Sequence, residues 1–235
     1  MTRFAGLDGC KGGWVGVALN RGRFDGAAVA ASAAAVVEAL GGTELDVIGI
    51  DIPIGLPALE ASSYRECDLA ARTVLRGRAS SVFFAPPLEI VSAGTYAEAN
   101  RRARSRWGKG ISAQAYYLGE KILEVRGTLA DDGALESLAD RVSEVHPELS
   151  FAAMSGGDGD AEPLALNKRS YGGVLARQGL LDREGIALSI DTADPVSKVQ
   201  VDDVLDAAAA AWSAARIAAD EHVTLGPRGG PTIRF

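Results

Sequence analysis

Acidic residues occur in this chain at places where an isolated carboxylate is unexpected. Asp8 follows the apolar residues of FAGLD, and Asp51 interrupts the apolar run LDVIGIDIPIGLP. In the last predicted helix, Asp203 and Asp206 are spaced i, i+3 and therefore share one helix face. An ionised carboxylate taken from water without a partner costs several kcal/mol. Oxygen ligation of hard divalent cations would neutralise such a group of carboxylates, so the pattern indicates a site for Mg²⁺ or Mn²⁺.

Two such ions, roughly 3.5 to 4 Å apart, activate water and stabilise the leaving oxygen in phosphodiester hydrolysis. In this hypothesis Asp8 bridges the two ions, Asp51 and Asp206 complete their ligand shells, and Asp203 orients the attacking water. Each residue alone also has a structural explanation. Asp8 can cap the following turn, Asp51 can accept backbone N–H groups, and Asp203 can lie near a positive helix N-terminus.

The segment RVSEVHPELSFAAM adds further titratable groups. We expect an apolar strand here, with Glu144, His146 and Glu148 around its end. Either glutamate could take the water-orienting role in place of Asp203. His146 is a candidate substrate contact, general base or metal ligand, although a histidine held by backbone contacts at a strand end is the alternative.

Basic and aromatic residues that could contact a phosphate backbone lie in three segments. They are Lys11 in the glycine-rich turn, Arg78, Arg102 and Trp107 in the middle of the chain, and Lys168 and Arg177 in LNKRSYGGVLARQG. Cations exceed anions between residues 60 and 110, and Trp107 within NRRARSRWGKG could stack on a base. Solvated surface charges and a core tryptophan are the alternatives. The net charge of −7 argues against coating of nucleic acid by the whole surface.

The elements that must position these residues follow an α/β order. RFAGLDGCKGGWVGVAL predicts two strands around a glycine-rich turn, and RFDGAAVAAS predicts a third. SAAAVVEALGG predicts a helix with Ser32 as its cap, and LDVIGIDIPIGLP predicts a strand buried on both faces. A basic helical region precedes RVSEVHPELSFAAM, SGGDGDAEPLALNKRSYGG predicts a loop, and VDDVLDAAAAAWSAARIAA predicts a long final helix. In an α/β sheet the C-terminal strand ends meet at one edge, where ligand sites form.

Length and composition bound the class of protein. A chain of 235 residues, with 47% hydrophobic and 23% charged residues, is typical of a soluble globular protein. We expect a single domain over 1–235 with a basic helical elaboration at about 58–127. The two cysteines form no CxxC pair, and we find neither an apolar leader nor a membrane span. A cytoplasmic protein without a membrane partner is therefore expected; its oligomeric state is left open, a homodimer included.

Five ordered motifs also resemble a known family. GLDGCKGGWVGVAL, IGIDIPIGLP, RASSVFFAPP, EVHPELSF and DDVLDAAAAAW are similar to motifs of the family called domain of unknown function 429, regarded as predicted nucleases. The resemblance implies a ribonuclease H-like mixed sheet, with three antiparallel opening strands and then parallel strands, flanked by helices. It also implies a metal site like that of Holliday-junction resolvases, onto which Asp8, Asp51, Asp203 and Asp206 match. Glu144 and Glu148 belong to the family's own motif and have no clear counterpart in the resolvases.

The sequence therefore predicts a hydrolase, a metal-dependent nuclease that acts on a nucleic acid of unspecified type. Two alternatives stay open. An actin-like or kinase-like ATPase would place a nucleotide phosphate against a similar Asp-Gly hairpin, although such proteins usually carry two such domains. A ribonuclease H-like binding module that has lost catalysis is the other.

Overall fold

Three antiparallel strands open a five-stranded sheet in this computed structural model, which describes residues 2–57, 64–156 and 161–235. They are β1 (Arg3–Cys10), β2 (Gly13–Asn20) and β3 (Arg23–Ala30), and β4 (Val47–Ile50) and β5 (Val142–Glu144) then pair in parallel. The order across the sheet is β3-β2-β1-β4-β5. The expected mixed sheet, antiparallel and then parallel, is confirmed.

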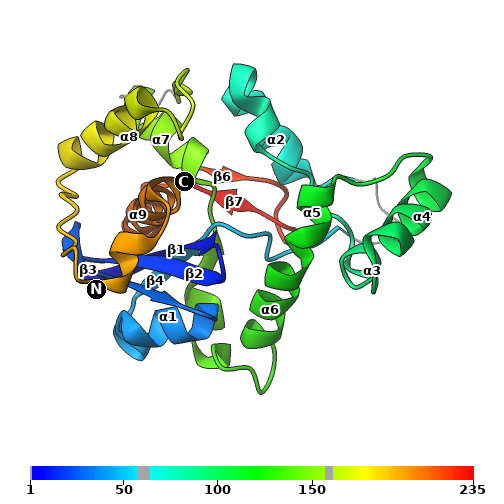
Figure 1. Ribbon diagram of the computed structural model, residues 1–235, viewed down its shortest axis with the longest axis horizontal. Helices are drawn as coiled ribbons and strands as arrows, with labels where there is room; N and C mark the ends of the chain where they lie inside the picture. Colours follow the sequence, from blue (N-terminus) through cyan, green and yellow to red (C-terminus); the bar gives the residue numbers. More distant parts are fainter. Residues whose placement is uncertain (1, 58–63, 157–160) are drawn as a thin grey trace.

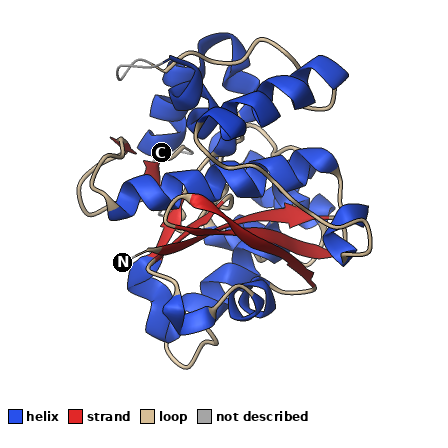
Figure 2. Cartoon of the chain, turned by 90° about the vertical axis from the view of Figure 1, so that its left-hand side faces the viewer, coloured by secondary structure: helices blue, strands red, loops and turns tan. Residues whose placement is uncertain are grey.

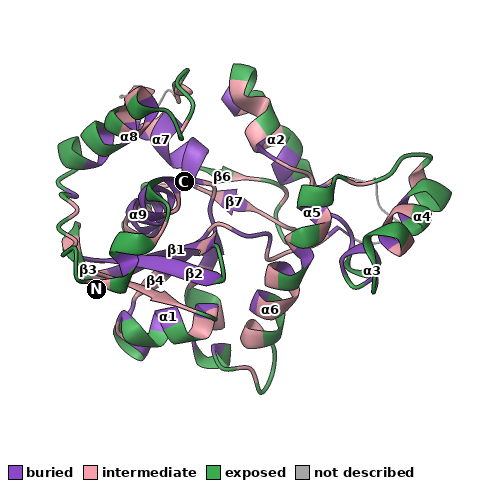
Figure 3. Ribbon diagram, viewed as in Figure 1, coloured by how far each residue is buried: buried purple, intermediate pink, exposed green. Residues whose placement is uncertain are grey.

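Helix α9 (Val201–Ala218) crosses one face of this sheet at close range (Figures 1 and 2). Its alanines permit the approach, and so do two strand glycines. A Cβ built on Gly6 would lie 2.0 Å from the backbone N of Ala211, and one on Gly49 would lie 2.5 Å from the carbonyl O of Ala210. The stretch of α9 from Val204 to Ala214 is therefore buried (Figure 3).

Side chains alternate between the two faces of β1. Phe4 and Cys10 pack in the core on the α9 side, whereas Ala5 and Leu7 pack in a second core on the opposite side. Helix α1 (Ala33–Ala39), capped by Ser32 as predicted, and helix α6 (Gly119–Leu129) cover that opposite side. Asp8 is separated from Phe4 and Cys10 by an even number of positions, so its side chain lies on the same face of β1, the face towards α9.

The remaining helices lie around these layers (Figure 1). They are α2 (Glu66–Leu75), α3 (Leu88–Val91), α4 (Tyr96–Trp107), α5 (Ala113–Tyr117), α7 (Pro147–Gly156) and α8 (Tyr171–Arg183). Short 3-10 turns are η1 (Gly42–Glu44), η2 (Arg76–Ser81), η3 (Glu136–Arg141) and η4 (Pro195–Lys198). A C-terminal hairpin pairs β6 (Thr224–Leu225) with β7 (Ile233–Arg234). No described helix is long and apolar enough to cross a membrane.

Three sequence expectations need correction. RVSEVHPELSFAAM is a strand only to Glu144, because Pro147, without an N–H to donate but with a helical φ, starts α7. The strand expected in LDVIGIDIPIGLP ends at Ile50, so Asp51 follows the strand instead of interrupting it. The loop predicted before residue 173 gives way to α8 at Tyr171, and the part of GGDGDAE at 157–160 lies outside the described residues.

Candidate metal centre

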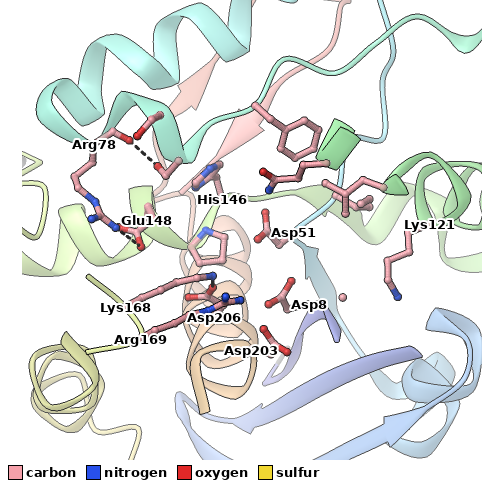
Figure 4. A pocket seen from close by; sticks show the side chains of 18 of the residues that line it. Asp8, Asp51, Arg78, Lys121, His146, Glu148, Lys168, Arg169, Asp203 and Asp206 are labelled. Carbon is pink, nitrogen blue, oxygen red and sulfur yellow. Dashed lines mark hydrogen bonds and ion pairs between the residues drawn. The ribbon is translucent and has the colours of Figure 1, made fainter. Parts of the chain in front are cut away.

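Three carboxylates meet at the C-terminal ends of β1 and β4. One oxygen each from Asp8, Asp51 and Asp206 can be chosen so that all lie within 4.8 Å of one another. Asp8 and Asp206 are buried, and Asp51 is half-buried. Figure 4 shows the three side chains pointing towards one another from β1, from the end of β4 and from α9. We call these residues the carboxylate triad.

Parallel pairing and the approach of α9 explain this geometry. The Asp51 N–H donates to the Leu7 carbonyl at 2.9 Å, so β4 is still registered against β1 where Asp51 begins. Asp206 lies in the second turn of α9, one residue before the helix reaches its contact with Gly6. The sheet and one helix thus bring together residues that are nearly 200 positions apart in the chain.

Burial and mutual repulsion disfavour the ionised form of the triad. Burial raises the pKa of Asp8 well above its usual value, and the charges of Asp51 and Asp206 raise it further. Burial likewise raises the pKa of Asp51 to about 7 and that of Asp206 to about 6, although the nearby Lys168 lowers both. Near neutral pH the triad therefore retains protons, which a bound cation would displace.

Lys168 borders the triad on one side. Its Nζ donates to Asp206 Oδ2 at 2.5 Å, and the pKa of Lys168 is raised because Asp206 outweighs the effect of burial. The other oxygen, Asp206 Oδ1, is buried and has no hydrogen-bond partner among the described residues. An orphaned carboxylate oxygen in an all-oxygen donor set fits a hard cation such as Mg²⁺ or Mn²⁺.

Asp203 lies one turn before Asp206 and lines the same cavity. Burial raises its pKa, and the neighbouring Asp202 raises it further. Asp202 accepts a hydrogen bond from Arg169 Nε at 2.8 Å, which neutralises it outside the triad. Of the two acids predicted on this helix face, Asp206 belongs to the triad, and Asp203 lines the cavity beside it.

Glu148 lines the same cavity but is held by arginines. Arg177 Nη2 donates to Glu148 Oε1 at 2.6 Å, and Arg78 Nη2 lies 3.6 Å from the same oxygen. Arg78 lines the cavity, as a residue that contacts a substrate must. Arg177 is completely buried and lies outside the lining, which corrects the expectation that it contacts a phosphate. Its guanidinium instead serves as the internal counterion of Glu148.

Glu144 points away from the triad, contrary to the expectation for a catalytic residue. Arg65 Nη2 donates to Glu144 Oε1 at 2.7 Å, and the Ile54 N–H donates to Oε2 at 2.9 Å. The same arginine also binds Asp68. The last residue of β5 is therefore used to anchor α2 to the sheet, and this role is structural.

His146 does reach the cavity, half-buried, between β5 and α7. Burial lowers its pKa, against the raising effects of Glu148 and Asp206, so the imidazole is neutral at pH 7. Its Nδ1 has no hydrogen-bond partner among the described residues. The imidazole can therefore accept a proton in this wall of the site.

Three other predicted contacts lie apart from the triad. Lys11 is exposed in the turn between β1 and β2 and does not line the cavity. Arg102 binds Glu98 and donates to the Glu89 carbonyl at 2.9 Å on the surface of α4. Trp107 packs at the end of α4 and lines a neighbouring cavity. Their contacts with a substrate stay predictions.

Sequence reasoning missed two cations of this cavity, Lys121 and Arg169. Lys121, on α6, donates to the Gly13 carbonyl and lies 4.5 Å from the ring centroid of Trp14. Its position depends on how α6 docks on the sheet, so no local signal marks it. Arg169 adjoins Lys168 in NKRS, and that pair of cations was a usable signal.

The cavity has a volume of about 460 Å³, and both acids and cations line it (Figure 4). Fold and site together define an α/β protein with a mixed sheet and a carboxylate triad at the strand ends. The family model described as "Protein of unknown function (DUF429)" matches residues 6–228, and the chain belongs to this family. Neither a curated protein nor a solved structure matches the chain significantly.

Proposed function

We propose that this protein is a metal-dependent nuclease that hydrolyses phosphodiester bonds at the carboxylate triad. The observation that carries the proposal is the meeting of Asp8, Asp51 and Asp206 oxygens within 4.8 Å. Only oxygen ligands are offered, one of them has no hydrogen-bond partner among the described residues, and burial, with neighbouring carboxylates, raises the pKa values of all three acids. Each of these properties fits a bound Mg²⁺ or Mn²⁺.

The arrangement of acids along the fold supports the same proposal. One acid lies on the first strand, one directly follows the fourth strand, and one lies in the last helix, on a sheet ordered β3-β2-β1-β4-β5. This is the arrangement that resemblance to ribonuclease H-like nucleases implies. Bound metal ions would supply a water of lowered pKa and Lewis acidity at the scissile phosphate.

The residues around the triad have complementary tasks in this proposal. Arg78, Lys168 and Arg169 place positive charge at the cavity wall, where they can bind phosphate oxygens. Asp203, which lines the cavity beside the triad, can accept a hydrogen bond from the attacking water. The neutral His146 can accept a proton, or donate one to the leaving oxygen once protonated.

The test is Mn²⁺-dependent cleavage of single-stranded, duplex, hybrid and branched substrates by the wild type and by Asp8→Asn. A matched control is Asp182→Asn, an exposed aspartate on α8. We expect cleavage by the wild type and the control, none by Asp8→Asn, and loss of cleavage on chelation. Cleavage that survives chelation, or an Asp8→Asn variant as active as the wild type, would disprove the mechanism.

Two further outcomes would favour the alternatives. Micromolar binding of ATP or ADP with magnesium, measured by calorimetry without any cleavage of nucleic acid, would favour the ATPase. Failure of the triad to bind Mn²⁺ at millimolar concentration would favour a binding module without catalysis.

A further inference from the structure

A second cavity, of about 400 Å³, lies beside the carboxylate triad's cavity. Its lining combines aromatic rings and cations: Tyr64, Arg72, Phe83, Phe84, Trp107 and Lys109. We call it the aromatic cavity. Its residues come from α2 and the segment just before it, from η2 and the loop after it, and from the end of α4 and the chain that leads into α5.

The two cavities share part of their walls. Ser80, Phe83 and Gln114 line both of them. A ligand that follows this shared wall passes directly from the aromatic cavity to the site at the triad. The aromatic cavity is therefore placed to hold a part of the substrate next to the reacting phosphate.

Phe83 differs from the other rings of the cavity. Tyr64 and Phe84 lie against each other with centroids 3.9 Å apart, and Arg72 and Lys109 lie over them at 4.9 and 4.6 Å. Phe83 is half-buried, belongs to none of the hydrophobic clusters, and has no ring or cation stacked on it among the described residues. An apolar ring in this position leaves a face for a planar ligand.

Charge around the aromatic cavity favours a polyanion. Arg72 and Lys109 line it. The exposed arginines of α4, Arg101, Arg102, Arg104 and Arg106, lie outside this lining and add positive charge only to the surrounding surface. Aromatic faces that alternate with cations are the features that bind single-stranded nucleic acids, because bases stack and phosphates pair with the cations. A cavity of this volume is large enough for a single nucleobase.

We propose that the aromatic cavity binds an unstacked nucleobase of a single-stranded segment, stacked on Phe83 and adjacent to the phosphate at the triad. This inference rests on the proposed nuclease function and names its substrate class. A paired base inside a duplex keeps its faces stacked on its neighbours, so it cannot enter such a cavity without leaving the helix. We therefore expect single strands, or the unpaired ends and loops of a duplex, to be preferred as substrates over a fully paired duplex.

The test measures binding separately from cleavage. Fluorescence anisotropy in EDTA would use fluorescein-labelled eight-nucleotide thymidine and uridine strands, with a fully paired duplex of the same length. Variants are Phe83→Ala, Phe83→Leu and Phe83→Tyr, with Tyr171→Ala, an exposed aromatic residue in neither cavity, as the control. Circular dichroism and thermal melting would verify that each variant folds.

Loss of one stacked base is worth about 1 to 3 kcal/mol, which corresponds to weaker binding by roughly fivefold or more. We expect this loss for single strands in Phe83→Ala and Phe83→Leu, wild-type binding in Phe83→Tyr and Tyr171→Ala, and little change for the duplex. The thymidine and uridine arms show whether DNA or RNA is preferred. In Lys109→Gln, the dependence of log affinity on log salt should fall by about one.

Three results would overturn the inference. The first is wild-type affinity in both Phe83→Ala and Phe83→Leu, the second is an equal loss of affinity for duplex and single strand, and the third is no single-strand binding by the wild type. These outcomes are distinguishable from failure of the nuclease proposal. If Asp8→Asn abolishes Mn²⁺-dependent cleavage while Phe83 variants bind normally, the nuclease stands and the base site fails. If nothing is cleaved but Phe83→Ala weakens single-strand binding, the base site stands without catalysis.

Discussion

The ammonium group of Lys168 lies 2.5 Å from Asp206 Oδ2, on the border of the carboxylate triad. Lys168 comes from the loop before α8, whereas Asp206 comes from α9, so the contact joins two segments outside the sheet. The lysine places one positive charge where three acids repel one another. It therefore stabilises the apo site and also opposes a divalent cation there.

Replacement of Lys168 tests this double role. In Lys168→Met, without divalent cations at pH 8, we expect the free energy of unfolding to fall by about 1 to 2 kcal/mol. A hydrogen bond to a charged group contributes about 1.5 to 3 kcal/mol, and the partial exposure of Lys168 reduces that. The same variant should bind Mn²⁺ more tightly, because a competing charge is gone. Urea unfolding and calorimetry would measure both effects, with the exposed Lys198→Met as the control; weaker Mn²⁺ binding would contradict the prediction.

Asp51 should lower stability at neutral pH. Its pKa rises from 3.8 to about 7 on folding, so its contribution to stability is fully present below pH 3.8 and is lost as the pH rises through about 7. Asp51→Asn should therefore be more stable than the wild type at pH 8 in EDTA, by about 1 to 3 kcal/mol, with no such gain near pH 4. Urea unfolding at pH 4, 6 and 8 measures the difference. A variant that is less stable than the wild type at pH 8 would refute this account of the triad.

Binding of Mn²⁺ should depend steeply on pH. Metal binding requires ionised carboxylates, and Asp51 and Asp206 take up protons as the pH falls through about 7 and 6. We expect the affinity for Mn²⁺, measured by calorimetry, to fall by at least about tenfold between pH 7.5 and pH 5.5. Asp182→Asn should behave as the wild type does, whereas Asp206→Asn should bind weakly at both values. Affinity independent of pH would place the ion elsewhere.

Glu144 should matter for stability and not for the metal. Its buried carboxylate is paired with Arg65, and removal of one partner leaves the other charge uncompensated. Arg65→Met should therefore destabilise the protein by about 3 to 5 kcal/mol. Glu144→Gln should also destabilise it but should leave the affinity for Mn²⁺ unchanged, as urea unfolding and calorimetry would show. Loss of Mn²⁺ binding in a folded Glu144→Gln variant would return this residue to the site.

Gly6 should be required for the position of Asp206. A Cβ on Gly6 would lie 2.2 Å from the Ala207 carbonyl and would push α9 off the sheet. We expect Gly6→Ala to lose most of its stability and its Mn²⁺ binding. Gly127→Ala, on α6, is the matched control, because a Cβ there meets nothing within 4 Å and should stabilise the helix by about 0.5 to 1 kcal/mol. A Gly6→Ala variant with wild-type stability would show that the close approach of α9 is dispensable.

Local sequence patterns were sufficient to predict the strands and helices that carry the site. Alternating apolar residues around glycine-rich turns predicted the three opening strands, Ser32 predicted the start of α1, and the alanine run predicted α9. Because strand ends converge in an α/β sheet, these elements predicted that Asp8, Asp51, Asp203 and Asp206 share one site, and the structure brings the first, second and fourth of them together. Each of these inferences depends on periodicity or capping, which act over a few residues.

Only the tertiary structure decided which of the other charged residues face the triad. Glu144 and Glu148 are four residues apart, yet Arg65 takes the first away from the cavity and Arg177 and Arg78 hold the second within it. Arg177 looked like a surface cation and is a buried counterion, whereas Lys121 gave no signal and lines the site. Which buried charged residues form ion pairs depends on desolvation and on contacts between segments that are distant in the chain. A local sequence pattern carries no information about such contacts. The types and spacing of the residues thus determined the acids of this protein, and long-range packing decided which cations meet them.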